Sequence, residues 1–382
     1  MAEGNHRMCD NKKNNPIRVL HVLTAMNRAG TETMLMNLYR EIDRTKIQFD
    51  FAVSATTECD YDKEIKNLGG KLFRYPKYKG VNHISYKLWW NKFFIDHPEY
   101  KIVHGHIGST AAIYLKIAKK HNIFTIAHSH STGGKLSIRS ALYKMYSYNT
   151  RNIADYFIGC SKEALVNRYG TRIAENTDIS AVLNNGVDVQ KYIYDEQIRD
   201  AVKKELCLND KLLLVGTVGR FTEAKNVFFI VDIISELNKV CTDFRFIWAG
   251  TGELKDQVKG YIEEKNLEDK IIMLGVRDDI PRILQILNVF ILPSKYEGLP
   301  VIGVEAQAAG VPMLCSNKVS QEVKMTDCCT FLPIDSPKVW AESILRERTF
   351  RRITSAPEDV IKAGYDIRST AAWLTDVYES VL

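Results

Sequence analysis

The sequence contains no apolar run that approaches the roughly 18 residues needed to cross a bilayer as a helix. Its first fifteen residues are polar and lack the apolar core of a secretory signal peptide. We therefore expect residues 1–15 to be a disordered extension and the protein to be cytoplasmic.

The eight cysteines form no C-x-x-C pair and no cysteine–histidine spacing typical of a metal site. Cys328 and Cys329 are adjacent, a spacing that seldom closes a disulfide. We expect all of them to be reduced thiols, as in cytosolic proteins.

Acidic residues are scarce in one segment of the chain. The net charge is only +6, but residues 71–151 contain fourteen Lys and Arg and two acidic residues. Such asymmetry predicts an anionic partner. An anionic membrane surface would explain the charge and the aromatics of Ser85–Ile95, an expected interfacial helix, whereas no motif supports nucleic-acid binding. For that helix alone the favoured interpretation is an ordinary helix, with its aromatics in the core and its lysines in water.

At 382 residues the chain is too long for one average core, so two domains are expected. Apolar runs alternate with helical stretches, which predicts a doubly wound parallel α/β sheet in each domain. The expected strands are Ile17–Leu23, Phe49–Ala55, Lys71–Tyr75, Ile102–His106, Phe124–His128, Tyr156–Cys160, Leu212–Val218, Phe244–Ala249, Ile271–Leu274, Val289–Leu292, Pro312–Ser316 and Thr330–Leu332.

The turn signal Asn184-Asn185-Gly186 and the charged, low-complexity stretch Asp188–Asp210 separate the two patterns. We predict a first Rossmann-like domain over residues 16–190 and a second over residues 191–368. The amphipathic stretch 369–382 is expected to be a helix that crosses back onto the first domain.

A strand–loop–helix unit over residues 289–312 carries the main chemical signal. The apolar run Val289–Leu292 is followed by a polar loop, and Pro300 is expected at the first position of a helix that ends at Gly310. Ligands bind at such loops, beyond the carboxyl ends of parallel strands.

Two acidic residues flank the start of this helix, Glu297 in the loop and Glu305 in the second helical turn. A helix N-terminus attracts anions, so two acids beside it are unusual for a phosphate site alone. They suit a ligand that carries both phosphate and hydroxyl groups, such as a nucleotide sugar.

The loop after Leu212–Val218 is basic and contains Arg220 and Lys225. Arg and Lys at the end of a strand can clamp a diphosphate. A solvated basic loop is the simpler interpretation of these two residues alone. Combined with Glu297 and Glu305 at the same sheet edge, they favour a ligand site.

The order of these motifs resembles the retaining glycosyltransferases of family 4, whose GT-B fold has two Rossmann-like domains facing across a cleft. The resemblance extends from Ile17 over nearly the whole chain, and the E-x7-E unit from Glu297 to Glu305 is its most specific mark. The second half is similar to members that assemble bacterial exopolysaccharide or capsule. The other motifs are Gly219-Arg220 with Lys225, Ala249-Gly250-Thr251-Gly252, Leu274-Gly275, His128 in TIAHSH and Asn185-Gly186-Val187-Asp188.

The resemblance implies a role for each matching residue of the second domain. Glu297 would bind donor-sugar hydroxyls at the reacting end, and Glu305 the ribose hydroxyls. Arg220 and Lys225 would neutralise the leaving diphosphate, and the backbone near Val276 would contact the base.

The backbone amides of Gly298, Leu299 and the neighbours of Pro300 would hold the sugar and phosphate, since proline itself has no donor. In the first domain Gly30 would approach the diphosphate and His128 would line the donor–acceptor junction.

Two first-domain assignments have competing interpretations. The loop Ala29-Gly30-Thr31-Glu32 stands where the family usually has Gly-Gly-x-Glu. Alanine is disfavoured wherever φ is positive, so a differently shaped loop is expected. His128 competes with His106 and His130, and a histidine at a strand end is often structural.

Asp60-Tyr61-Asp62 mimics the metal-binding D-x-D of the other glycosyltransferase fold. It follows no apolar strand, and Asp60 is expected to be a helix N-cap. We therefore predict no metal and no cofactor.

The resemblance implies a metal-independent, retaining transferase that uses a UDP or GDP sugar as co-substrate. The expected acceptor is a glycan or a polyprenyl-diphosphate-linked sugar, at the inner face of the cell membrane. A nucleotide-sugar epimerase on a similar fold and a non-enzymatic nucleotide-binding protein are the alternatives.

Overall fold

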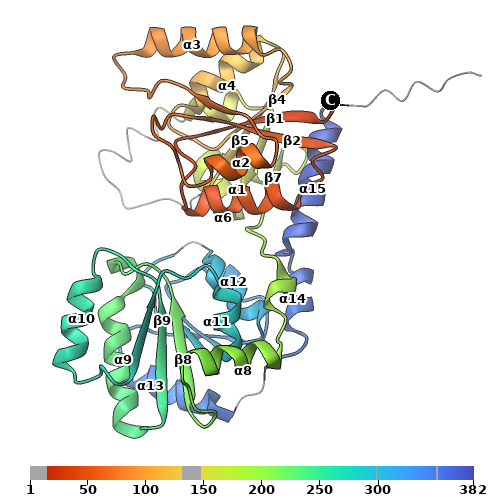
Figure 1. Ribbon diagram of the computed structural model, residues 1–382. Helices are drawn as coiled ribbons and strands as arrows, with labels where there is room; N and C mark the ends of the chain where they lie inside the picture. Colours follow the sequence, from red (N-terminus) through yellow and green to blue (C-terminus); the bar gives the residue numbers. More distant parts are fainter. Residues whose placement is uncertain (1–14, 131–147, 298, 350–351) are drawn as a thin grey trace, which may run out of the picture. The chain divides into compact units, whose positions relative to one another are not determined.

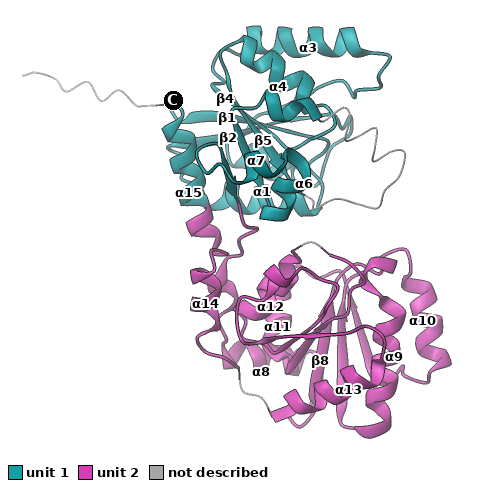
Figure 2. Ribbon diagram, turned by 180° about the vertical axis from the view of Figure 1, so that it is seen from behind, with its two compact units in different colours: residues 1–182, 371–382 teal, residues 183–370 magenta. Residues whose placement is uncertain are grey.

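The computed structural model describes residues 15–130, 148–297, 299–349 and 352–382. The chain divides into two compact units (Figure 2), unit 1 with Met1–Val182 and Ala371–Leu382 and unit 2 with Leu183–Thr370. Each unit has a parallel sheet with helices packed on its faces (Figure 1).

Within the described part of unit 1, seven strands form one parallel sheet in the order β3-β2-β1-β4-β5-β6-β7. The strands are β1 Ile17–Leu23, β2 Ile47–Val53, β3 Leu72–Arg74, β4 Ile102–Gly105, β5 Phe124–Ser129, β6 Tyr156–Gly159 and β7 Ser180–Val182. The helices are α1 Gly30–Glu41, α2 Asp62–Asn67, α3 His83–Asp96, α4 Ala111–Lys120, η1 Asn149–Asn152, α6 Lys162–Tyr169 and α7 Thr171–Ala174. The strand order reverses between β1 and β4, the position where ligands bind in such sheets.

Unit 2 has six strands in its described residues, in the order β10-β9-β8-β11-β12-β13. They are β8 Leu213–Val218, β9 Phe244–Ala249, β10 Ile271–Gly275, β11 Val289–Leu292, β12 Met313–Ser316 and β13 Cys329–Leu332. The helices are η2 Val189–Tyr192, α8 Glu196–Glu205, η3 Glu223–Lys225, α9 Val227–Val240, α10 Lys255–Glu264, α11 Ile280–Ile286, α12 Val301–Ala308, η4 Gln321–Val323, α13 Pro337–Arg346, η5 Glu347–Thr349 and α14 Ala356–Lys362. Apolar side chains of β8, β9 and β11 fill the layers between the sheet and these helices.

The charged stretch 188–210 contains η2 and α8, which were not predicted. The Asp195 carboxylate accepts hydrogen bonds from the amides of Gln197 and Ile198, which caps the start of α8. Pro300 is the N-cap of α12 and not its first residue.

The last helix, α15 Ile367–Ser380, runs from unit 2 into unit 1, where its residues from Ala371 onward belong (Figure 2). Leu374 and Tyr378 are fully buried. The C-terminal helix therefore contributes to the core of unit 1, although it is far from that core in sequence.

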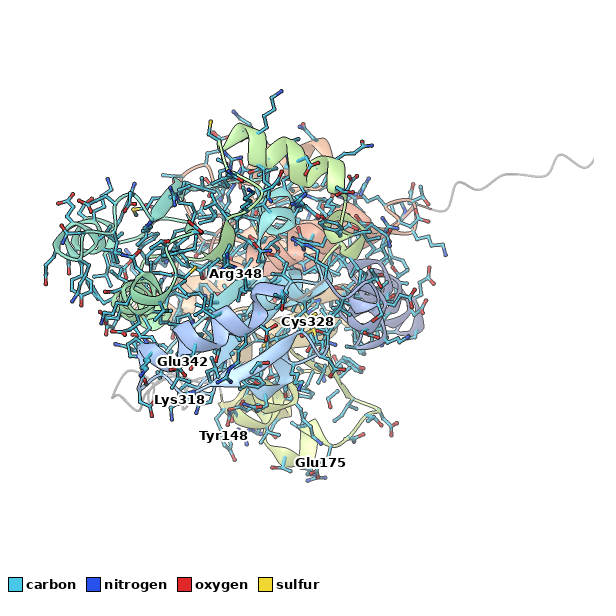
Figure 3. All side chains as sticks on the ribbon, turned by 90° about the horizontal axis from the view of Figure 1, so that it is seen from below. Tyr148, Glu175, Lys318, Cys328, Glu342 and Arg348 are labelled. Carbon is cyan, nitrogen blue, oxygen red and sulfur yellow. The ribbon has the colours of Figure 1, made fainter. Side chains whose placement is uncertain are left out.

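The seven cysteines within the described residues are all free thiols. In Figure 3, Lys318, Glu342 and Arg348 are labelled among the side chains of unit 2, where they are exposed. Cys328, labelled in the same view, is buried, and burial raises the pKa of its thiol. A buried thiol with a raised pKa is unreactive, so we assign it to packing.

Candidate active site

The carboxyl ends of β8 and β11 are neighbours in unit 2, because the two strands pair directly. The loops that follow them line one small pocket. Its polar lining comes from Arg220 and Lys225 after β8 and from Ser294 after β11. The structure thus brings together residues that are about seventy positions apart in the sequence.

Glu297 and Lys225 form an ion pair across these two loops, with 2.8 Å between Lys225 Nζ and Glu297 Oε2. The Ser294 hydroxyl donates a hydrogen bond to the other carboxylate oxygen, Oε1. The two side chains are largely but not completely buried, with Lys225 22% and Glu297 14% exposed. Both carboxylate oxygens are therefore oriented, and a ligand can still reach the group.

Further bonds tie the two loops together. Asn226 adopts the left-handed conformation, with φ of 56°, and its side-chain amide donates to the carbonyl of Pro293 at 3.2 Å. The amide of Lys295 donates to the carbonyl of Ala224 at 2.8 Å. Asparagine tolerates left-handed backbone better than most residues, which explains its place beside Lys225.

Arg220 is exposed at the mouth of the β8 loop and forms no ion pair with another described residue. The backbone beside it is tightly packed. Gly250 has φ of 139°, and a Cβ there would lie 2.0 Å from the carbonyl oxygen of Gly219. The β8 and β9 loops therefore approach closely only because residue 250 is glycine.

α12 begins at Val301, four residues after Glu297. Pro300 is buried at the N-cap, and no side chain caps the helix. Uncapped amides at a helix start bind anions well. Leu299 packs against the core of unit 2. Gly298, predicted to contact the sugar and phosphate, lies outside the described residues.

Glu305 is in the second turn of α12, as predicted. Burial raises the pKa of its carboxyl group, and a hydrogen bond from the Tyr192 hydroxyl opposes that rise. Tyr192 itself is 7% exposed and lies at the end of η2. A half-buried carboxylate with one fixed partner suits recognition of ligand hydroxyl groups.

Val276, predicted to lie near the base, follows Gly275 at the end of β10 and is 69% exposed. Gly275 has φ of 68°, and its carbonyl accepts from the amide of Gly250 at 2.7 Å. The backbone next to Val276 is accordingly held by the β9 loop while its side chain stays in solvent.

In unit 1, Gly30 is the first residue of α1, and a Cβ added there would meet no atom within 4 Å. Ala29 is the N-cap with φ of −123°, ordinary extended backbone. This loop does not place Ala29 at positive φ, in agreement with the expectation of a loop shaped to suit alanine.

His128, at the end of β5, is buried and belongs to a cluster of histidines at the point where the strand order reverses. His104 lies on β4, His106 directly follows β4, and His130 directly follows β5. His21 on β1 completes the set, paired in register with His104. Burial lowers the pKa of all five histidines below the ordinary value, so each ring is neutral at pH 7.

Two overlapping groups of these histidines could hold a metal ion, since their ligand nitrogens lie within 4.8 Å of one another. The groups are His21 with His104 and His106, and His106 with His128 and His130. Several of these ring nitrogens already bond to each other, at 3.0 Å between His21 Nδ1 and His106 Nε2 and 2.8 Å between His106 Nδ1 and His130 Nε2. That no metal takes part in catalysis stays a prediction.

The D-x-D segment is occupied by protein contacts. Asp60 accepts a hydrogen bond from the Arg28 amide at 3.0 Å, and Asp62 accepts one from the Cys59 amide and pairs with Arg74. The prediction that Asp60 caps α2 was wrong, because the N-cap is Tyr61 and no side chain caps the helix.

Sequence reasoning missed several residues of the site. Ser294 and Asn226 orient the loops, Tyr192 orients Glu305, and His104 bonds to His128. An Asn directly before an apolar helix was a usable signal for a special backbone conformation. The partner of Glu305 carried no signal, since a lone Tyr more than a hundred residues away has none.

Comparison with known proteins matches both halves of the chain to family models. Residues 28–191 match the model described as "Glycosyltransferase Family 4", and residues 198–344 match "Glycosyl transferases group 1". Two curated relatives and a solved structure represent the wider similarity.

EpsF of Bacillus subtilis (strain 168), itself named as a glycosyltransferase, is 31% identical over 370 residues, covering 94% of this chain and 96% of EpsF. An Escherichia coli UDP-Gal:alpha-D-GlcNAc-diphosphoundecaprenol alpha-1,3-galactosyltransferase is 35% identical over 140 residues, 36% of each chain. The Anabaena Alr3699/HepE structure in complex with UDP superposes with a TM-score of 0.78 at 15% identity, covering 95% of this chain and all of that one.

The likeness to HepE shows the fold, and the match to EpsF extends over nearly the whole of both chains. The two parallel sheets, with acidic and basic loops converging at the edge of the second, agree with that fold. The chain therefore has the GT-B fold and belongs to glycosyltransferase family 4.

Proposed function

We propose that the protein transfers a sugar, with retention of configuration, from a nucleotide-diphosphate donor to a hydroxyl group of a growing cell-surface polysaccharide. The observation that carries the proposal is the ion pair of Glu297 with Lys225, beside Arg220 at the edge of one sheet. The pair supports a site in which Glu297 binds sugar hydroxyls while Lys225 and the nearby Arg220 bind phosphate.

The chemistry follows from where charge develops. The bond between the anomeric carbon and the leaving phosphate oxygen breaks, so the diphosphate gains negative charge as the sugar becomes oxocarbenium-like. Arg220, Lys225 and the uncapped amides of α12 stabilise that charge where it forms. No metal is needed for this stabilisation.

Retention is proposed to proceed on one face of the sugar. Double displacement requires a second carboxylate about 5–5.5 Å from the first, acting on the same bond. Glu305 does not serve, because its half-buried carboxylate already accepts a hydrogen bond from Tyr192. The new bond forms from the acceptor oxygen to the anomeric carbon, and the leaving phosphate oxygen takes the acceptor proton.

Names of the relatives support the substrate classes. HepE was crystallised with UDP, and the Escherichia coli relative is named for a UDP-Gal donor and a diphosphoundecaprenol-linked acceptor. We propose a UDP sugar first, a GDP sugar second, and a polyprenyl-diphosphate-linked glycan as acceptor.

The test is nucleotide release from a panel of UDP and GDP sugars, with and without a short polyprenyl-diphosphate-linked sugar. We expect one donor to give release that depends on the acceptor, together with a product that keeps the donor's anomeric configuration. An inverted product would refute retention. An epimerised free sugar without transfer would favour the epimerase alternative.

A second part of the proposal concerns the membrane. No helix in the described residues has the length and apolarity to span one. On α3, however, Ile84, Leu88 and Ile95 are 74, 63 and 60% exposed, and their spacing places them on one helix face. Exposed Lys87 belongs to the same helix, and Lys77 and Lys79 precede it.

The aromatics of Ser85–Ile95 follow the ordinary-helix interpretation, because Tyr86, Trp90, Phe93 and Phe94 are buried in the core. The aliphatic face of α3 is what remains for a partner. An apolar stripe flanked by lysines fits the headgroup and acyl boundary of an anionic bilayer. We propose that this face holds the enzyme at the inner surface of the cell membrane.

For this face we predict that replacing Ile84 and Leu88 by Ser lowers binding to phosphatidylglycerol vesicles about tenfold, since two aliphatic side chains lose their burial in lipid. Co-sedimentation measures the binding. The matched control is Val240→Ser, which removes a side chain that is 65% exposed on α9 of unit 2. Wild-type binding that does not depend on acidic lipid content would overturn the proposal.

A further inference from the structure

Besides the contacts among His21, His106 and His130, a separate chain of hydrogen bonds links the C-terminal helix to His128. The Tyr378 hydroxyl lies 2.7 Å from His104 Nδ1, and His104 Nε2 lies 3.2 Å from His128 Nδ1. Tyr378 and His104 are fully buried and His128 is 3% exposed. The remaining nitrogen, His128 Nε2, is buried without a hydrogen-bond partner among the described residues.

The protonation state of each group determines which partner donates in each hydrogen bond of this chain. Burial lowers the pKa of both histidines and raises that of Tyr378, so the rings are neutral and the phenol keeps its proton. A neutral imidazole has one N–H and one lone pair. Each bond in the chain therefore determines which nitrogen of the next ring carries the proton.

Tyr378 decides between the two possible directions. If His104 donated to Tyr378, the phenol proton would be buried with no second acceptor among the described residues, a costly state. If Tyr378 donates to His104 Nδ1, then His104 carries its proton on Nε2 and donates to His128 Nδ1. His128 must then carry its own proton on Nε2.

We propose that Tyr378 and His104 are positioning residues that hold His128 in the Nε2–H tautomer, so that a substrate oxygen bound beside His128 in unit 1 meets a hydrogen-bond donor and not a base. The proposal rests on the transfer reaction proposed above. The unpartnered Nε2–H is shielded from water and gains its bond when a ligand oxygen accepts from it. A base is not required, because the leaving phosphate takes the acceptor proton.

The tautomer itself is the first readout. In protein with ¹⁵N-labelled histidine, the protonated and unprotonated ring nitrogens of His128 give separate signals, assigned by their loss in His128→Gln. We expect a proton on Nε2 in the wild type and a mixture of tautomers in Tyr378→Phe. Unchanged His128 signals in Tyr378→Phe would refute the proposal, whatever the activity.

The second readout is the rate of transfer. Tyr378→Phe is expected to lower kcat about tenfold with little change in KM, the size of one misdirected hydrogen bond. The glutamine amide can donate from the position of Nε2, so His128→Gln should be slowed about tenfold and His128→Leu about a hundredfold. In the His128→Gln background, Tyr378→Phe should have almost no further effect, because Gln has no tautomer to set.

The matched control is Tyr39→Phe. Tyr39 is equally buried in unit 1 and donates to the Leu68 carbonyl at 3.1 Å, outside the histidine cluster. It should leave the His128 signals and kcat unchanged. If Tyr39→Phe and Tyr378→Phe lower kcat equally, the role of Tyr378 is only in packing. If Tyr378→Phe changes the His128 tautomer but the wild type transfers no sugar, the positioning role of Tyr378 stands and the proposed function is refuted.

Discussion

Glu297→Gln is expected to transfer sugar about 10²- to 10³-fold more slowly than the wild type, as when one oriented group is removed from a transition state. Glutamine keeps the shape and the contact with Ser294 but loses the charge that holds Lys225 at 2.8 Å. The loss should fall on kcat, because the sugar hydroxyls and the diphosphate both lose an oriented partner.

Initial rates of transfer at saturating donor measure this effect, together with a thermal unfolding curve. The matched control is Glu223→Gln, since Glu223 pairs with Lys295 between the same two loops but is 67% exposed, whereas Glu297 is 14% exposed and pairs with Lys225. It should stay within about twofold of the wild type, because exposed ion pairs contribute little. A Glu297→Gln enzyme that is as fast as the Glu223→Gln enzyme would remove Glu297 from the reaction.

Arg220→Ala is the second variant for which we expect a large effect, a fall in kcat of about 10²- to 10³-fold. Arg220 is exposed at the pocket and has no ion pair with the described residues, so its charge is available to the diphosphate. UDP affinity should fall less than kcat, because the diphosphate gains charge only as it leaves.

Isothermal titration with UDP and steady-state rates separate the two quantities. Arg220→Lys should lie between the wild type and Arg220→Ala, because lysine keeps the charge but not the planar fork. The control is Arg346→Ala, which removes an exposed arginine from the end of α13. A loss of UDP affinity with kcat unchanged would mean that Arg220 binds the diphosphate equally well before and during the reaction and does not stabilise the transition state selectively.

Much of the second unit was predictable because its strands are buried on both faces. Such strands appear as continuous apolar runs, and Val289–Leu292 and Phe244–Ala249 were predicted to the residue. In the first unit, β7 was missed, since a strand of three residues that begins with Ser180 has no continuous apolar run. α8 was missed because a surface helix with few apolar residues resembles a charged linker.

The site was predictable where local spacing sets it. Glu297, Glu305 and the start of α12 lie within one strand–loop–helix unit, so their order is a property of the sequence. The residues that contact Glu297 cannot be predicted from local spacing, because Lys225 reaches Glu297 only when β8 and β11 pair.

The sequence by itself determined the α/β class, the acidic and basic loops and the family they resemble, because these depend on periodicity and short-range order. The tertiary structure alone decided that Lys225 pairs with Glu297, that α3 turns its aliphatic face outward, and that Tyr378 bonds to His104. The last contact joins residues 274 positions apart. Long-range partners leave no trace in local composition, since they are selected by packing across strands and helices.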